Sequence, residues 1–196
     1  MKKLIFCLPL IFLITLFTFN LSAQLAINLV SVENAQIDCL EANIELNLND
    51  DVTLVEGENC EYATDFSNVK IGNNELSISS DKLLNEEVST FDMVLLVQAL
   101  LSINELSSYA QAIAADVDND RVISTDDLVL LRQLILFEVT EIEEAVKIGS
   151  TDLLTESFEG FELRSNFTTY MFDKEDVEDG VNKDLLIIRV GDLDQQ

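Results

Sequence analysis

Two segments of thirteen residues repeat each other: Ser89-Thr-Phe-Asp-Met-Val-Leu-Leu-Val-Gln-Ala-Leu-Leu101 and Ser124-Thr-Asp-Asp-Leu-Val-Leu-Leu-Arg-Gln-Leu-Ile-Leu136. They share eight identical residues at a constant offset of 35 positions. Both are apolar over most of the circumference of a helix, and such a helix must be covered by other parts of the protein. The repeat therefore predicts two helices, which we expect to pack into one cluster together with a short helix that lies between them in the sequence.

The second copy follows a twelve-residue segment with the spacing of a calcium loop, Asp116-Val-Asp-Asn-Asp-Arg-Val-Ile-Ser-Thr-Asp-Asp127. An EF-hand-type loop of this spacing surrounds Ca²⁺ with about six to eight oxygens. The predicted ligands are the carboxylates of Asp116, Asp118, Asp120 and Asp127, the hydroxyl of Ser124 or a water that it holds, and the backbone carbonyl of Val122. Position 6, which is normally Gly because the chain turns there with positive φ, is Arg121. The alternative is an acidic turn that merely precedes a helix.

The first copy offers a weaker loop when the positions are counted back from its last acid. The candidate ligands are Asp81, Asn85, Glu87, Ser89 and Asp92. Position 3 of this loop is Leu83 and position 6 is Glu86, so an acid and a glycine are both missing from their usual places. The sequence predicts one good calcium site and one degraded site.

Two loop-helix repeats without an incoming helix before the first resemble a dockerin type I domain, in the variant carried by secreted proteins of Bacteroidetes-like bacteria. The resemblance covers about residues 81–136 and includes Ile113-Ala-Ala-Asp-Val-Asp-Asn-Asp120, with a weaker likeness at Ile187-Ile-Arg-Val-Gly-Asp-Leu193. It implies a non-catalytic, calcium-binding module that docks onto a cohesin-like domain or another surface protein. Such modules belong to extracellular polysaccharide-degrading or cell-surface assemblies. The Ser-Thr pairs stand at loop positions 9 and 10, whereas the cohesin-contacting pair of dockerins usually stands at 10 and 11.

The N-terminus has the features of a secretory signal peptide over residues 1–23. Lys2 and Lys3 precede an apolar run, and a small residue, Ala23, stands at the expected cut. A membrane anchor, the alternative, needs a run nearer to about twenty apolar residues. We therefore expect a secreted, cell-surface or periplasmic protein with no membrane span after the signal is removed.

The net charge of −26 makes nucleic acid an improbable partner, because nucleic acid attracts cationic surfaces. Cys39 and Cys60 are an even pair in an exported chain, so a disulfide between them is the default expectation. The absence of His rules out Ser-His-Asp and Cys-His nucleophile systems.

Two other functions stay open beside the interaction module. A polysaccharide-processing glycoside hydrolase needs two opposed carboxylates, and Glu156, Glu159 and Glu162 are unspecific candidates among 37 acidic residues. A carbohydrate-binding adhesin could stack sugars on Tyr62, Tyr109 or Tyr170. The prediction is a non-enzyme, since nothing in the sequence marks out a catalytic pair.

These patterns together predict an α+β fold in which a duplicated calcium-loop and helix unit, residues 81–138, is flanked by small β layers. Residues 24–80 form the first β region, with predicted hairpins at 43–55 and 70–78, and residues 139–196 form the second. Ser107 or Ser108 is expected to cap a short helix that contains Tyr109 and Ile113. One or two strands are predicted within 161–172, and a largely buried strand over 185–190.

Overall fold

The computed structural model describes residues 24–31, 44–56, 61–80, 88–140, 142, 144–176 and 182–194. The predicted signal peptide, the Cys39–Cys60 pair and the first-loop residues Asp81, Asn85 and Glu87 lie outside these ranges.

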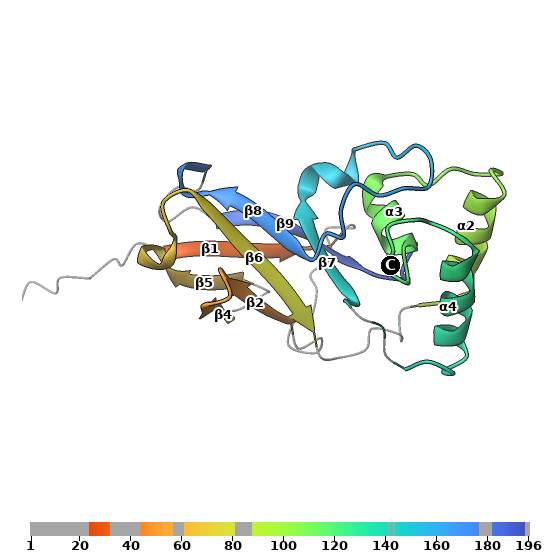
Figure 1. Cartoon of the computed structure of the whole chain (residues 1–196), viewed down its shortest axis with the longest axis horizontal. Helices are drawn as coiled ribbons and strands as arrows, with labels where there is room; N and C mark the ends of the chain where they lie inside the picture. The colour runs from red at the N-terminus through yellow and green to blue at the C-terminus, as the bar shows by residue number, and fades with distance from the viewer. Residues whose placement is uncertain are drawn as a thin grey trace, which may run out of the picture.

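The described part of the chain contains two β-sheets that face each other (Figure 1). The larger sheet has the order β4-β5-β1-β9-β7, and the smaller has the order β3-β2-β6-β8. The strands are β1 (Gln24–Val30), β2 (Ile44–Leu48), β3 (Val52–Thr53), β4 (Val55–Glu56), β5 (Glu61–Asp65), β6 (Asn73–Ser80), β7 (Val146–Ser150), β8 (Thr169–Asp173) and β9 (Asn182–Arg189).

Alternating apolar residues close the space between the two sheets, because side chains two apart on a strand point to the same face. On β2 these inward residues are Ile44, Leu46 and Leu48, and on β1 they are Leu25 and Ile27. The hairpin predicted at 43–55 is present as β2 and β3, and Asn49 and Asp50 in its turn both have positive φ. The alternation of the sequence thus produces one sandwich core.

Three α-helices lie at one end of the sandwich: α2 (Thr90–Leu100), α3 (Tyr109–Ala115) and α4 (Thr125–Ile135). Each begins after a serine whose hydroxyl accepts a backbone N–H bond, namely Ser89, Ser108 and Ser124. The duplicated helices α2 and α4 pack side by side, and α3 packs against β9. Within the described ranges, no helix has the length and apolar character needed to cross a membrane.

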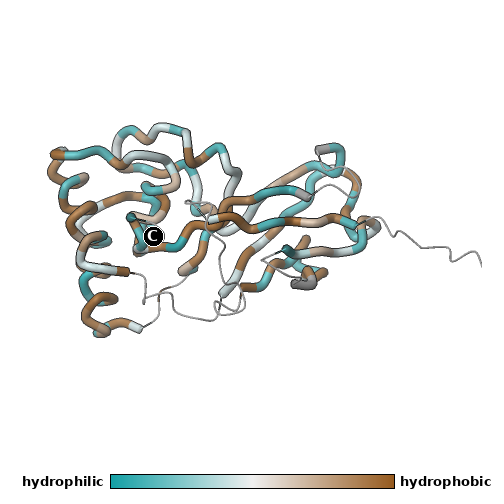
Figure 2. The backbone as a smooth tube through the Cα atoms, turned by 180° about the vertical axis from the view of Figure 1, so that it is seen from behind, coloured by the Kyte–Doolittle hydropathy of each residue, from teal (hydrophilic) through white to brown (hydrophobic). Residues whose placement is uncertain are grey.

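Strand β9 belongs to two hydrophobic cores at once. Leu185 and Ile187 point into the sandwich, whereas Leu186, Ile188 and Val190 point into the helical cluster. The hydrophobic residues along this strand and the helices are visible in Figure 2. A strand covered on both faces needs a continuous apolar run, and the predicted buried strand at 185–190 is confirmed.

The predicted fold class was wrong. The molecule is a β-rich sandwich with helices at one end, and not a helical calcium unit flanked by small β layers. The strands before and after the helices share both sheets: β1 pairs in parallel with β9, and β6 pairs with β8. The sequence identified strands on both sides of the helices but gave no information on their pairing across more than 90 residues of chain.

One local prediction also needs correction. The hairpin predicted at 70–78 is not formed, because Lys70 and Ile71 lie outside any strand and β6 pairs with β2 and β8 instead. The prediction of one or two strands within 161–172 is confirmed: the described residues contain one, β8, which starts at Thr169. The segment before it contributes a single bridge, between Val122 and Glu162.

Candidate functional site

The predicted calcium loop connects α3 to α4. Asp116 caps the C-terminus of α3, and Ser124 caps the N-terminus of α4. Carboxylate oxygens of Asp116, Asp118 and Asp120 all lie within 4.8 Å of one another, so this acidic group can hold a metal ion. The fold therefore brings the side chains of three of the six predicted ligands together.

Hydrogen bonds from the backbone fold this loop around its acids. The Asp118 carboxylate accepts from the amide of Asp120 at 3.2 Å, and the Asp120 carboxylate accepts from the amide of Val122 at 2.7 Å. The amide of Arg121 donates to both oxygens of Asp116, at 3.2 and 3.1 Å. Arg121 has φ +72°, so the position that is usually Gly adopts the left-handed conformation although it carries a large side chain.

Asp127 fastens the two ends of the loop to each other. One of its oxygens accepts from the amides of Val117 (2.7 Å) and Asp118 (3.1 Å), and the other accepts from the amide of Ser124 (2.7 Å). The Ser124 hydroxyl accepts from the amide of Asp126 at 3.0 Å. Asp127 and Ser124 thus stand at the loop but are engaged with its backbone, outside the group of three acids.

Burial makes negative charge costly in this loop. It raises the pKa of Asp127 to about 6, against the opposing effect of the amide of Ser124. Burial is also the main cause of a raised pKa at Asp116 and Asp118, and the neighbouring carboxylates add to it. A cation bound among these acids would relieve both the repulsion and the desolvation of their charges.

A buried lysine supports the loop from the adjacent strand β7. The ammonium of Lys147 is almost fully buried, donates to the Glu144 carboxylate at 2.8 Å and also bonds the Asn119 side-chain oxygen. The side-chain amide of Asn119 in turn donates to the Glu144 carboxylate. Burial lowers the pKa of Lys147, and the charge of Lys147 partly opposes the burial that raises the pKa of Asp116. Lys147 therefore fixes the middle of the loop and offsets part of its negative charge.

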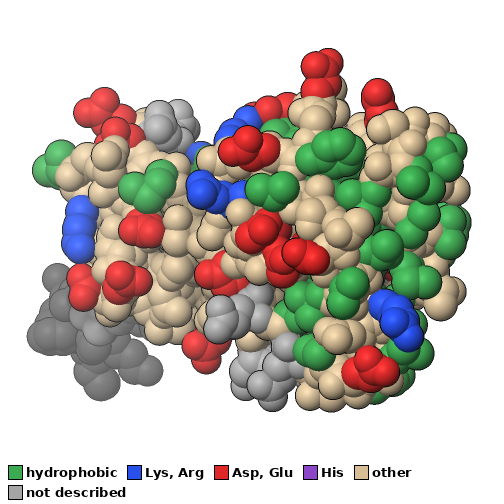
Figure 3. Space-filling view, turned by 45° about the vertical axis from the view of Figure 1, so that its right-hand side comes forward, with side chains coloured by type: hydrophobic (Ala, Val, Ile, Leu, Met, Phe, Trp, Pro, Cys, Tyr) green, Lys and Arg blue, Asp and Glu red, His purple; other side chains and the backbone are tan. Residues whose placement is uncertain are grey.

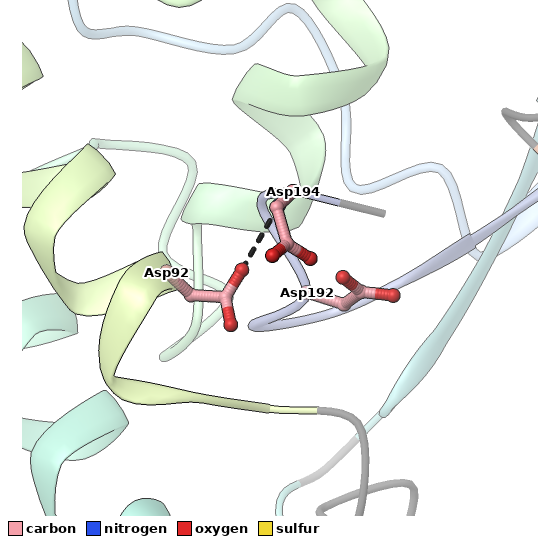
Figure 4. Close-up of side chains that lie close together, drawn as sticks. All are labelled: Asp92, Asp192 and Asp194. Atoms are coloured by element: carbon pink, nitrogen blue, oxygen red, sulfur yellow. Dashed lines mark hydrogen bonds between the residues drawn. The ribbon is translucent and has the colours of Figure 1, made fainter. Parts of the chain in front are cut away.

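A second acidic group, which the sequence did not predict, lies at the start of α2. It consists of Asp92, Asp192 and Asp194, whose carboxylate oxygens also lie within 4.8 Å of one another. Asp92 projects from the first turn of α2 toward the turn after β9 that carries the other two (Figure 4). Asp92 and Asp192 are buried, and this group can also hold a metal ion.

The hydrogen bonds around Asp92 repeat those around Asp127. One oxygen of Asp92 accepts from the amides of Leu193 (2.7 Å) and Asp194 (2.9 Å), and the other accepts from the amide of Ser89 (2.7 Å). Asp192-Leu-Asp194 therefore takes the place at α2 that Asp116-Val-Asp118 takes at α4. Helix α2, which belongs to the first repeat, thus contacts an acidic segment, Asp192-Leu-Asp194, that lies about a hundred residues further along the chain.

The sequence contained one signal for this second group: Asp192-Leu-Asp194 has the same Asp-apolar-Asp pattern as Asp116-Val-Asp118. Asp192 and Asp194 lie about a hundred residues after Asp92. A calcium-loop pattern of twelve consecutive residues that ends at Asp92 therefore could not include them. Of the residues predicted for the first loop, Ser89 and Asp92 are described: Asp92 is a member of this acidic group, and the backbone amide of Ser89 donates to it.

Several of the residues considered for other functions have structural roles. Glu156 forms a two-pronged ion pair with Arg164, at 2.5 and 3.0 Å, while Glu159 and Glu162 are exposed. The Tyr62 hydroxyl donates to the backbone oxygen of Ile44 inside the sandwich. The remaining aromatic candidates pack within the protein: Tyr109 is buried beside Phe158, and Tyr170 stacks on Phe172.

The comparisons with known proteins add no relative to this description. No protein-family model, curated protein or solved structure matches the chain.

Proposed function

We propose that the protein is a secreted, non-catalytic interaction module that binds calcium in the loop between α3 and α4. The observation that carries this proposal is the convergence of Asp116, Asp118 and Asp120 in a loop whose last acid, Asp127, lies in the first turn of α4. All candidate donors are oxygens, which suits a hard cation such as Ca²⁺ better than a metal that prefers nitrogen or sulfur. Ser124 and the carbonyl of Val122 complete the proposed set.

A second calcium ion is proposed for the group of Asp92, Asp192 and Asp194. The support is the duplication: the same helix sequence, the same serine cap and the same three amide bonds surround Asp92 and Asp127. Each ion would join a helix start to a segment from elsewhere in the chain. In this proposal calcium stabilises the arrangement of the duplicated helices.

The proposed docking surface is the outward face of α2 and α4. Exposed apolar side chains gather over this end of the molecule (Figure 3). They include Phe91, Val94, Leu101, Val129, Leu136 and Phe137. Val94 corresponds to Val129 in the repeat, and Leu101 to Leu136. Contiguous apolar surface of this kind marks interaction sites, and the partner proposed is a cohesin-like domain or another extracellular surface protein.

Calorimetric titration of the chelated, mature protein with Ca²⁺ tests the metal sites. We expect two ions per chain, and about 1 kcal/mol of added stability per site in millimolar calcium if each Kd is about 10⁻⁴ M. Asp116→Asn should remove one ion and Asp192→Asn the other, whereas the exposed control Asp152→Asn should remove neither. A stoichiometry of zero would refute calcium binding, and an unchanged stoichiometry in Asp192→Asn would refute the second site.

The docking surface has its own test. A recombinant cohesin domain is titrated onto the calcium-loaded protein, and onto the double variant Val94→Glu/Val129→Glu, which places charge on the proposed face. We expect binding to the parent protein alone. Equal binding by the variant would place the interface elsewhere, and no binding by either would exclude cohesin as the partner.

A further inference from the structure

A pocket of about 290 Å³ opens at the C-terminal end of α2, beside the proposed docking face. Its apolar lining comes from Ala99 and Leu106 near the helix end and from Phe158 and Phe161 in the segment after β7. Phe158 is buried, whereas Phe161 is 42% exposed and offers part of its ring to solvent. The pocket thus combines an apolar base with an accessible aromatic wall.

The charges around this pocket favour a cation. The acidic residues Glu105 and Glu159 are among those that line it, and neither forms an ion pair with any residue that the structure describes. The C-terminus of a helix carries a partial negative charge, which attracts cations. The last turn of α2 contains no basic residue to neutralise it.

An arginine of the chain itself already occupies a comparable arrangement next to the pocket. The Arg164 guanidinium lies 4.5 Å from the centre of the Tyr109 ring and pairs with both oxygens of Glu156. The Tyr109 ring packs edge-on against the pocket residue Phe158, with 5.3 Å between ring centres. A planar guanidinium suits such sites, because it can stack on an aromatic ring and pair with a carboxylate simultaneously.

We propose that this pocket receives an arginine side chain of the partner protein. This inference rests on the proposed docking function and adds the chemistry of one anchor residue. The guanidinium would stack on Phe161 and pair with Glu105 or Glu159, while its aliphatic stem covers Ala99 and Leu106. Ser102 lines the pocket and lies between Leu101 and Ile103, both 64% exposed, so the pocket is at the edge of the apolar docking face.

The test is an NMR titration of the calcium-loaded full chain with Nα-acetyl-arginine N-methylamide. The uncharged analogue Nα-acetyl-citrulline N-methylamide has almost the same shape and is the matched probe, and the lysine analogue is the second comparison. We expect arginine to shift the amide signals of the residues that line the pocket and to bind more tightly than either comparison probe. Equal binding of citrulline would show that charge is not recognised, and equal binding of lysine would overturn the choice of arginine.

Variants distinguish arginine binding in the pocket from a general attraction of the cationic probe to an acidic protein. Glu105→Gln/Glu159→Gln should weaken arginine binding about fivefold, because each exposed ion pair contributes modestly. Glu138→Gln, at the end of α4 and outside the pocket, should leave it unchanged. An equal loss in both proteins would overturn the proposal. If the protein bound calcium but not arginine, only the arginine-pocket proposal would be refuted. If it bound arginine but took up no calcium, only the calcium proposal would be refuted.

Discussion

At the scale of single residues, Asp127 links the charge of the loop to pH. Its pKa in the fold, about 6, lies above that of an unfolded aspartate, so the fold binds this proton more tightly than the unfolded chain does. The contribution of Asp127 to the stability of the metal-free protein therefore grows as pH falls through 6 and is lost as pH rises through it. Calcium has the opposite dependence, since it binds the deprotonated carboxylate.

We accordingly expect the melting temperature of the metal-free protein to be higher at pH 5 than at pH 7. Calcium affinity should fall about tenfold between pH 7 and pH 5, as one linked proton requires. Circular dichroism melts and calcium titrations at pH 5, 6 and 7 measure both effects. In Asp127→Asn the metal-free protein should lose the part of the pH dependence centred near 6; an unchanged slope would contradict the role of this carboxylate.

Arg121 allows a second prediction at this scale. Its φ of +72° costs a residue with a side chain about 1 kcal/mol that Gly would avoid. Arg121→Gly should therefore keep or raise the free energy of unfolding, by up to about 1 kcal/mol, and should tighten calcium binding by removing a positive charge. Arg132→Gly, on the exposed side of α4, should instead lose about 1 kcal/mol. Urea denaturation compares them, and equal losses would show that the loop conformation carries no strain.

At the scale of elements, the turn after β9 brings the second acidic group to α2. Gly191 has φ +90°, and a Cβ there would lie 3.2 Å from Val88 and 3.3 Å from Leu131. We expect Gly191→Ala to lower stability by about 2 kcal/mol and to weaken the metal site at Asp192 more than the site at Asp116. Gly72→Ala is the control: its φ is +89° but no atom crowds the new Cβ, so only about 1 kcal/mol should be lost. Similar losses in thermal melts would mean that the close packing around Gly191 is unimportant.

At the scale of the whole molecule, β9 couples the sandwich to the helices. Ile187 is buried in the sandwich core and Ile188 in the helical core, although they are neighbours on one strand. Truncating either to Ala should cost about 2–5 kcal/mol and should lower the melting of sheet and helices together, because each change loosens the shared strand. Hydrogen exchange and circular dichroism measure the two parts separately. If Ile188→Ala melted the helices and left the sheets intact, the two cores would be independent units.

The sequence by itself determined the features that depend on neighbouring residues. Ser89 and Ser124 mark the starts of the duplicated helices, and the acids at every second position from Asp116 to Asp120 form a group at the end of α3. The apolar run at 185–190 identified a strand buried on both faces. Helix caps, loop spacing and side-chain alternation are local properties, so the sequence is sufficient to predict them.

Only the tertiary structure decided which distant segments meet. β1 pairs with β9 rather than remaining in a separate N-terminal layer, and Asp92 meets Asp192 and Asp194, which lie about a hundred residues further along the chain. These contacts follow from the burial of β9 between two cores, which selects one pairing among many that the strand pattern allows. Their energy depends on how the whole apolar surface is covered, and no spacing within a short segment specifies it.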